Sequence, residues 1–478
     1  MAVQHPEVMF FGNNDDKEDS DNNEDEADAT RCVKLALAPN VAAYKEKKEL
    51  LRDAESVPCS SSLADNVTSN YIIAKQIISN LPWQEKILCK NVCSTWHSAV
   101  HALSKEQMDP QDFVINVMSI SSKCGTTFIQ SGTFYNEPLV VFTFVNTYGM
   151  NLVSKCKNIT PCPCRNPCEK EHSLLDLVNH MANAPKNRMY TVKADFISYL
   201  PLPNSITYKH AITHLKNKPF IGGVYIPIIP GVEFHTIHLI PDTILIKEDF
   251  FDVVGNIAKD RIFKGVLVFV TERYLLHTVE DIVFLNYFKD MQPDIPYALG
   301  GCIIEDTVLD ESDINVIVDG INDNTDFMSD NLLSIGFFTI PKNSENREGN
   351  FDMFSLILES SAWSKPKIQQ SINEFSKQVP KFEHSVAIKL SCVGRDQKHK
   401  LEQDLFRVAF PNTRIIGCYG NGELGLNHPA KPTSESIPNA AKRHRDDPGP
   451  QYGIMYSYST VFVYIGWGKI LANPVKVN

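Results

Sequence analysis

Five residues between 156 and 172 have side chains that could bind a metal ion. Thiolates and imidazoles are ligands that zinc prefers. Their spacing is irregular and lacks paired C-x-x-C knuckles, so a zinc site competes with loose reduced thiols in a surface loop. We therefore expect no metal and no cofactor. The residues are Cys156, Cys162, Cys164, Cys168 and His172.

A second group lies between 389 and 425, KLSCVGRDQKHKLEQDLFRVAFPNTRIIGCYGNGELG. The pattern predicts a buried strand ending at Cys392, a turn with Arg395, a helix, and a strand that enters a glycine-rich loop. Glycines let a backbone approach a bound group closely, although an ordinary turn has the same composition. The loop matches neither a P-loop nor a dinucleotide fingerprint. Glu423 could bind an amine or cap its own loop, and Arg395 could pair with a carboxylate ligand or with Glu423.

Nucleophilic catalysis would require a thiol beside a base and an orienting acid. Cys392 and Cys418 stand at expected strand ends, and His384 or His428 would have to act as the base. No spacing brings either imidazole beside a thiol, and a buried, inert cysteine is the commoner state. We therefore expect no catalytic residue.

Composition limits the classes of protein. The chain has 478 residues, 43% hydrophobic and 22% charged, which is enough for two or three domains. Of the net charge of -11, the first 28 residues carry ten acids and one base. This run predicts a disordered tail before a nearly neutral body, which makes nucleic acid an unsuitable partner. No apolar run approaches the roughly 18 residues of a membrane span, so we expect an intracellular protein with reduced cysteines.

The elements that position these residues follow from periodicity. Runs rich in β-branched and aromatic residues, such as 265–271, 386–392 and 459–466, predict strands. Amphipathic patterns at 367–378 and 397–406 predict helices. Such mixing favours α/β or α+β layers over a sandwich or a bundle.

Residues 71–102, YIIAKQIISNLPWQEKILCKNVCSTWHSAVHA, have the pattern of two or three short amphipathic helices. Pro82 should end one helix and suits the start of the next, so Leu81-Pro82 marks a corner. A segment of about thirty residues cannot close a core alone. Its apolar surface must therefore lie against the rest of the chain or against a partner, and the pattern leaves both open.

The order Leu81-Pro82, Ile87-Leu88, then Val92-Cys93 followed by Trp96 resembles the F-box family. That resemblance implies binding to the Skp-type adaptor of cullin-RING ubiquitin ligases, with Val92 and Trp96 mostly filling the module's own core. Many F-boxes open with a further Leu-Pro pair, which this chain lacks. The implied adaptor-binding residues are Ile73, Ile77, Leu81, Pro82, Trp83, Ile87, Leu88, Val92, Cys93 and Trp96.

The sequence Cys-Val-Gly-Arg at 392–395 and the glycine loop at 417–425 resemble the C-terminal half of a FIST domain. Upstream matches at 229–232, 299–301 and 335–337 follow in the order of the same family, so the two resemblances together cover about 63–426. FIST domains of bacteria and archaea resemble small-ligand sensors, which implies a pocket near the loop. The implied pocket residues are Gly300, Gly301, Gly336, Arg395, Tyr419, Gly420, Asn421, Gly422, Glu423 and Gly425.

The resemblances imply an α+β chain in which a small all-helical F-box precedes a large mixed α/β FIST domain in two subdomains. The expected divisions are a tail and linker at 1–62, the F-box at 63–104, and FIST halves at 105–298 and 299–478 with a polar insert at 427–451. The insert holds Lys442-Arg443-His444-Arg445, which could serve nuclear import or form a solvated loop. We expect a cytoplasmic and nuclear protein.

The implied function is that of a non-catalytic substrate receptor of an SCF-type E3 ubiquitin ligase. Its expected partners are the Skp-type adaptor, the cullin and RING subunits, and protein substrates destined for proteasomal degradation. Nucleic acid and membrane are not expected. The alternative is an intracellular small-ligand sensor, which would use the FIST pocket and leave the F-box without a role.

Overall fold

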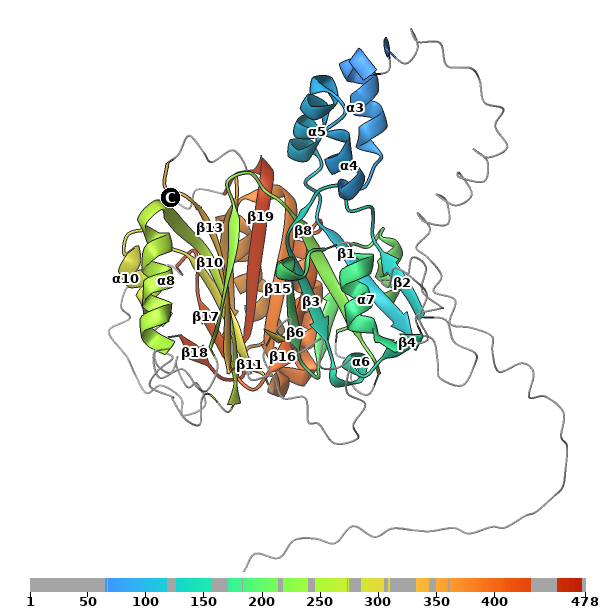
Figure 1. The fold of residues 1–478 in the computed structure, drawn as a ribbon. Helices are drawn as coiled ribbons and strands as arrows, with labels where there is room; N and C mark the ends of the chain where they lie inside the picture. The colour runs from blue at the N-terminus through green and yellow to red at the C-terminus, as the bar shows by residue number, and fades with distance from the viewer. Residues whose placement is uncertain are drawn as a thin grey trace, which may run out of the picture.

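The computed structural model describes residues 65–66, 68–117, 126–155, 171–182, 184–213, 218–239, 246–272, 274, 285–304, 308–309, 332–343, 350–359, 362–430 and 454–474. The predicted acidic tail, Cys156 to Cys168 and the basic run at 442–445 lie outside these residues. Within them the fold is α+β, as predicted: a small helical module projects from one end of a β-rich body (Figure 1).

The helical module contains α3 (Tyr71–Ser79), α4 (Trp83–Cys89) and α5 (Ser94–Glu106). Asn70 caps α3, because its side chain accepts hydrogen bonds from the backbone N–H groups of Ile72 and Ile73. Pro82, with φ of -65°, immediately precedes α4, so the predicted corner is confirmed. The three helices pack around a small core of Ala74, Ile78, Cys89, Ala99, Val100 and Leu103.

Three mixed or antiparallel sheets form the body, and we number them I to III. Sheet I has the strand order β12-β6-β3-β8-β1-β2. Helix α7 (Leu174–Met181) covers its outer face through Leu174, Leu175 and Val178. A hairpin of β4 (Val153–Lys155) and β5 (Glu171–Ser173) and the short α6 (Thr147–Met150) lie beside it. The sheet I strands are β1 (Gln111–Val117), β2 (Thr126–Gln130), β3 (Pro138–Val145), β6 (Met189–Lys193), β8 (Ile221–Pro227) and β12 (Val308–Leu309).

Sheet II has the order β18-β17-β11-β10-β13-β9. Its outer face is covered by α8 (Ile246–Asp260) and α10 (Tyr287–Met291), which bury Phe250, Val254 and Phe288 against the strands. Strands β10 and β11 run parallel, whereas the other pairs are antiparallel. The strands are β9 (Glu233–Leu239), β10 (Arg261–Thr271), β11 (Ala298–Ile304), β13 (Leu333–Pro341), β17 (Glu423–Leu426) and β18 (Met455–Tyr456).

Sheet III has the order β14-β19-β15-β16-β7. Parallel strands β15 and β16 are joined through helix α13, and α12 packs with α13 on the outer face. Phe406 of α13 stacks on Phe462 of β19 with ring centroids 4.2 Å apart. The elements are β7 (Ile197–Leu200), β14 (Asp352–Leu358), α12 (Lys365–Gln378), β15 (Lys381–Cys392), α13 (His399–Ala409), β16 (Arg414–Gly420) and β19 (Thr460–Ala472).

The inner faces of the three sheets share one core, which includes Phe142 of sheet I, Phe338 of sheet II and Trp467 of sheet III. The expected division between residues 298 and 299 falls at the start of β11. Strand β7 lies before this division in the chain, and it pairs with β16, which lies after it. The sheets therefore exchange strands across the division, and two separate subdomains stay a prediction. Among the described residues, no helix combines the length and apolar character needed to cross a bilayer.

The segment between α5 and β1 attaches the helical module to the body. Trp467 Nε1 donates to the carbonyl of Met108 at 2.9 Å, and His384 Nδ1 lies 2.9 Å from Asp109 Oδ1. Asn136 Nδ2 donates to the carbonyls of Ser104 and Gln107 at 2.9 and 2.8 Å. Contacts from sheet III and from the loop before β3 thus hold both ends of this connection.

Candidate docking face and the glycine loop

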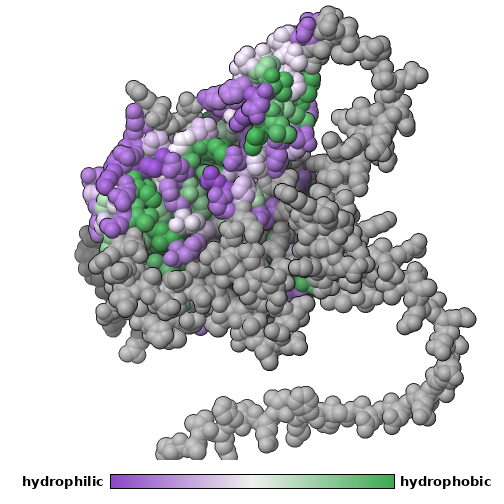
Figure 2. Space-filling view, viewed as in Figure 1, coloured by the Kyte–Doolittle hydropathy of each residue, from purple (hydrophilic) through white to green (hydrophobic). Residues whose placement is uncertain are grey.

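The helical module is apolar on its outside as well as in its core. Seven of the eighteen large apolar side chains that are exposed among the described residues belong to it. Ile72 is 73% exposed, Leu88 70% and Val92 53%. Figure 2 shows apolar side chains gathered over these helices. We call the seven residues the docking face: Tyr71, Ile72, Ile73, Ile77, Ile87, Leu88 and Val92.

Predicted adaptor-binding residues fall into two sets. Ile73, Ile77, Ile87, Leu88 and Val92 lie on the docking face. The other five are half-buried: Leu81, Pro82, Trp83, Cys93 and Trp96. The expectation that Val92 fills the core is wrong, because the turn after α4 directs it to the surface. Trp96 does pack against the core of the module, as expected.

Trp83 lies where the module meets the body. Its indole packs against the apolar core between sheet I and α7. Its backbone N–H donates to the carbonyl of Phe134 at 3.2 Å. Beside it, Lys86 is buried, donates to Gln107 and to the carbonyl of Tyr135, and lies 4.9 Å from the Tyr135 ring centroid. Burial lowers the pKa of Lys86 to about 8. The first residues of α4 therefore serve attachment to the body, which a periodicity argument could not reveal.

The glycines of the predicted pocket lie against protein atoms. A Cβ on Gly301 would lie 2.3 Å from the carbonyl oxygen of Val268, and one on Gly420 would lie 2.2 Å from that of Ile303. A Cβ on Gly300 would lie 2.3 Å from a methyl group of Val463. These glycines allow strands and sheets to approach each other closely, so the space that a ligand would need beside them is filled.

The remaining glycines of the set fit the same description. Gly336 faces the Phe234 ring, with a Cβ at 2.7 Å, and Gly425 faces Val461 at 3.1 Å. Gly422, with φ of +153°, turns the chain between β16 and β17. Asn421 closes this turn, since its backbone N–H donates to Ile303 at 2.8 Å and its side chain to Glu272 at 2.5 Å.

Arg395 does not pair with Glu423, which was one of the two partners that the sequence left open for it. Arg395 binds Glu402 instead, from both Nε (3.1 Å) and Nη2, and neither of these two side chains is exposed. Arg395 Nη1 also donates to the carbonyl of Tyr458 at 2.5 Å. Glu402 is one helical turn into α13, so the turn that precedes this helix brings the two side chains together.

Glu423 caps a different segment from the expected one. Its Oε2 accepts hydrogen bonds from the backbone N–H and the hydroxyl of Ser459, at 3.1 and 2.7 Å, rather than from its own loop. Its Oε1 is buried without a hydrogen-bond partner among the described residues. Burial, as the main cause, raises the pKa of Glu423 to about 8, so the carboxyl group is largely protonated at neutral pH.

Other polar residues complete a buried network behind the loop. Thr460 Oγ1 donates to Glu402 Oε2 at 2.7 Å and lies 2.6 Å from Ser391 Oγ. Lys389 Nζ donates to the carbonyl of His399 at 3.0 Å, and burial lowers its pKa to about 8. Tyr419 accepts from Lys389 at 3.3 Å and donates to the carbonyl of Thr213. These groups satisfy one another, which fits a structural role.

Neither candidate thiol contacts a candidate base. Cys418 is fully buried with its Sγ 3.5 Å from Cys302 Sγ, and burial raises the pKa of Cys392. His384 pairs with Asp109, and His428 stacks on a phenylalanine ring at 5.3 Å. The contacts of these four residues thus give no support to thiol catalysis.

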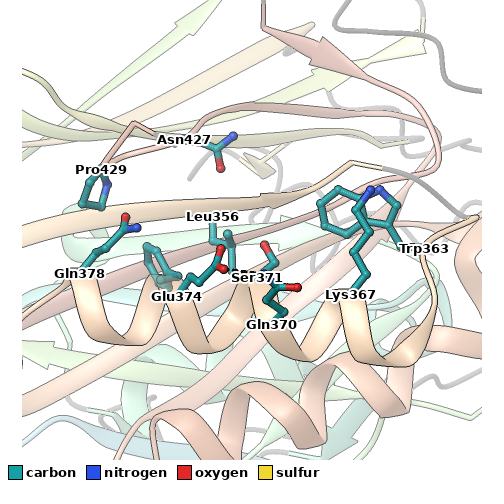
Figure 3. A pocket seen from close by; sticks show the side chains of 10 residues that line it. Leu356, Trp363, Lys367, Gln370, Ser371, Glu374, Gln378, Asn427 and Pro429 are labelled. Atoms are coloured by element: carbon teal, nitrogen blue, oxygen red, sulfur yellow. Dashed lines mark hydrogen bonds between the residues drawn. The ribbon is translucent and has the colours of Figure 1, made fainter. Parts of the chain in front are cut away.

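A groove that the sequence did not predict runs along α12 (Figure 3). It has a volume of about 290 Å³, with an apolar floor and a rim of amide and charged side chains. Lys367 Nζ lies 4.2 Å from the ring centroid of Trp363 at one end. The polar positions recur along the helix with the spacing of a solvated face, so periodicity gives no signal for the groove. Its lining is Leu356, Trp363, Lys367, Gln370, Ser371, Glu374, Phe375, Gln378, Asn427 and Pro429.

Comparison with known proteins gives no family assignment: no protein-family model matches the chain, and no curated protein does so.

Proposed function

We propose that the chain is the substrate receptor of an SCF-type ubiquitin ligase, in which the helical module is an F-box and the body is a FIST domain. The observation that carries this proposal is the docking face, because a module of about forty residues exposes seven large apolar side chains. Contiguous exposed apolar surface of this kind marks protein interaction sites. The family resemblance of the same residues names the Skp-type adaptor as the partner.

The attachment of the module supports a receptor role. A receptor acts by holding a target close to a ubiquitin-charged enzyme, which raises the effective concentration of the target's lysines. This mechanism needs a fixed relation between the adaptor-binding face and the target-binding body. Bonds from Trp467, Asn136 and Lys86 supply such a relation. In this role the chain contributes no bond-making residue, and it would work in the cytoplasm and nucleus.

The small-ligand sensor is the weaker alternative. It depends on a pocket beside the glycine loop, and the glycines there lie against Val268, Ile303 and Val463. No observation on the loop favours a ligand over a packing role.

The test is the affinity of the full chain for the purified Skp-type adaptor bound to the cullin N-terminal domain. The double variant Ile77→Asp with Leu88→Asp places two charges on the docking face, where the wild-type side chains are 42% and 70% exposed. Since burying such a side chain contributes about 1.5–3 kcal/mol, we expect affinity to fall at least about 100-fold with the fold retained. Val408→Asp, at a 77% exposed position of α13, is the matched control.

Unchanged affinity in the folded double variant would reject the docking face. Half-buried Leu81 and Pro82 are poorer probes, because changes there also disturb the junction with the body.

A further inference from the structure

The junction between the helical module and the body encloses a hollow of about 180 Å³. Its walls come from α4, α5, the loop before β3 and the segment after β8. We call it the junction hollow. No glycine of the predicted loop belongs to its lining, so it is a separate site. The lining includes Trp83, Lys86, Ile87, Glu137, Ile228 and Pro230.

Lys86 brings a buried positive charge into this lining. Only 3% of the residue is exposed, and its ammonium group forms no ion pair with a described carboxylate. It has three N–H donors, and the described residues supply two acceptors, Gln107 Oε1 and the carbonyl of Tyr135 at 3.1 Å. A buried charge is costly without a counter-charge, and burial lowers the pKa of Lys86 to about 8. An anion beside this group would supply the counter-charge.

Trp83 supplies a second donor from the same side of α4. It precedes Lys86 by three residues, and residues at this spacing are neighbours on a helix surface. Its Nε1 is buried, and no described group accepts a hydrogen bond from it. Buried donors of this kind are uncommon in native structures, because an unmet hydrogen bond is costly. The lining thus offers two donors, one charged and one neutral, that a single acceptor group could satisfy.

The rest of the lining combines apolar walls with a net positive charge. Ile87 is 40% exposed and Ile228 37% exposed, and they approach the hollow from the module and from the body. Lys90 and Glu137 also line it, so two lysines of α4 stand against one glutamate. A ligand that fits this lining is therefore partly apolar and negatively charged.

The volume limits the ligand to a few non-hydrogen atoms. It equals about six water molecules at roughly 30 Å³ each, and it lies below the roughly 300–1,000 Å³ of sites for drug-sized ligands. Water would satisfy the donors but not the charge, and inorganic phosphate would leave the apolar walls uncovered. A short carbon chain that ends in a carboxylate meets the conditions of size, charge and apolar contact together.

We propose that the junction hollow binds a small aliphatic carboxylate of the size of butanoate or pentanoate. The carboxylate group accepts hydrogen bonds from Lys86 Nζ and Trp83 Nε1, and the carbon chain packs against Ile87 and Ile228. Charge-assisted hydrogen bonds are about twice as strong as neutral ones, so the acid is preferred over its amide. The site is independent of the proposed receptor function, although Ile87 also belongs to the docking face.

The test is a titration of the full chain with pentanoate, measured by ligand-observed NMR, with pentanamide as the uncharged control. We expect saturable binding of pentanoate and at least about tenfold weaker binding of pentanamide. Ile228→Asp brings a negative charge to the lining and should weaken pentanoate binding at least about tenfold. Val408→Asp introduces the same residue at an exposed position outside the lining and should leave the affinity unchanged.

Trp83→Phe tests the neutral donor. This variant keeps an aromatic ring in the packing of the junction, and it should weaken pentanoate binding by about three- to tenfold. Lys86→Met is a less specific probe, because Lys86 also holds the carbonyl of Tyr135. Urea midpoints show whether each variant is folded.

Three results would overturn the inference: no saturable binding of pentanoate, equal affinities for pentanoate and pentanamide, or an affinity that survives both Ile228→Asp and Trp83→Phe. Binding of inorganic phosphate as tight as that of pentanoate would also overturn it, because the carbon chain would then contribute nothing. The titration uses the chain without the adaptor, so none of these results depends on whether the adaptor binds.

Discussion

Replacing Glu423 by glutamine should abolish a pH dependence of stability. In the folded chain burial, as the largest cause, raises the pKa of Glu423 to about 8 from its ordinary value of 4.5. Between these values the unfolded chain has released the proton and the folded chain still holds it, so stability falls as pH rises from about 4.5 to 8. At 1.36 kcal/mol for each unit of pKa, the loss amounts to about 5 kcal/mol.

Glu423→Gln keeps an acceptor for Ser459 and removes the titration. We expect the variant to lie within about 1 kcal/mol of wild type at pH 5, and to be more stable than wild type by several kcal/mol at pH 8.5. Urea denaturation of both proteins across this pH range measures the difference between their free energies of unfolding. Other titrating groups contribute equally to both proteins, so their contributions cancel in this difference. Lys389, whose pKa burial lowers to about 8, titrates in both proteins and therefore contributes to both pH profiles alike. Parallel pH profiles for the two proteins would refute the reasoning.

Two further predictions concern packing and buried charge. Gly301→Ala should destabilise the fold by about 3 kcal/mol, because its Cβ would lie 2.3 Å from a carbonyl oxygen. Gly255→Ala in α8, whose Cβ meets only a hydroxyl at 3.3 Å, should stabilise it by up to about 1 kcal/mol. If Gly301→Ala and Gly255→Ala changed the urea midpoint equally, the close-packing role of the loop glycines would be contradicted. Asp112→Asn should cost about 3 kcal/mol, since buried Asp112 accepts from Arg414 Nε at 2.8 Å. The control is Asp404 on α13, which forms an exposed ion pair with Lys400. Asp404→Asn should change stability by less than about 1 kcal/mol.

The sequence predicted the elements whose signals are local. The runs at 265–271 and 386–392 lie within β10 and β15, the run at 459–466 begins one residue before β19, and the amphipathic patterns correspond to α12 and α13. Helix α8 was missed although Phe250, Val254 and Ala258 recur every four residues, and all three are buried. That spacing was a sufficient signal for the helix.

The packing of the glycines in the candidate pocket could not be predicted from the sequence, for a physical reason. A glycine allows close approach of any group, and composition does not say whether a ligand or another strand is the group that approaches. At Gly301 and Gly420 the approaching atoms are backbone carbonyls of the neighbouring strands. For Arg395 the sequence offered a carboxylate ligand or Glu423, and the turn before α13 instead brings it to Glu402, which the sequence did not single out.

The placement of the docking face relative to β19 gives the fold a direct bearing on mechanism. Cys93 and Trp96 secure the helices internally, whereas Trp467 and His384 hold the connection that follows α5. Both of the latter belong to paired strands of sheet III, His384 to β15 and Trp467 to β19. The hydrogen bond from Trp467 to Met108 and the close contact of His384 with Asp109 thus join this sheet to the segment that follows the helices. In the proposed receptor, rigid coupling of this kind would limit the volume that a target's lysines can explore, which is the condition under which proximity alone raises a transfer rate.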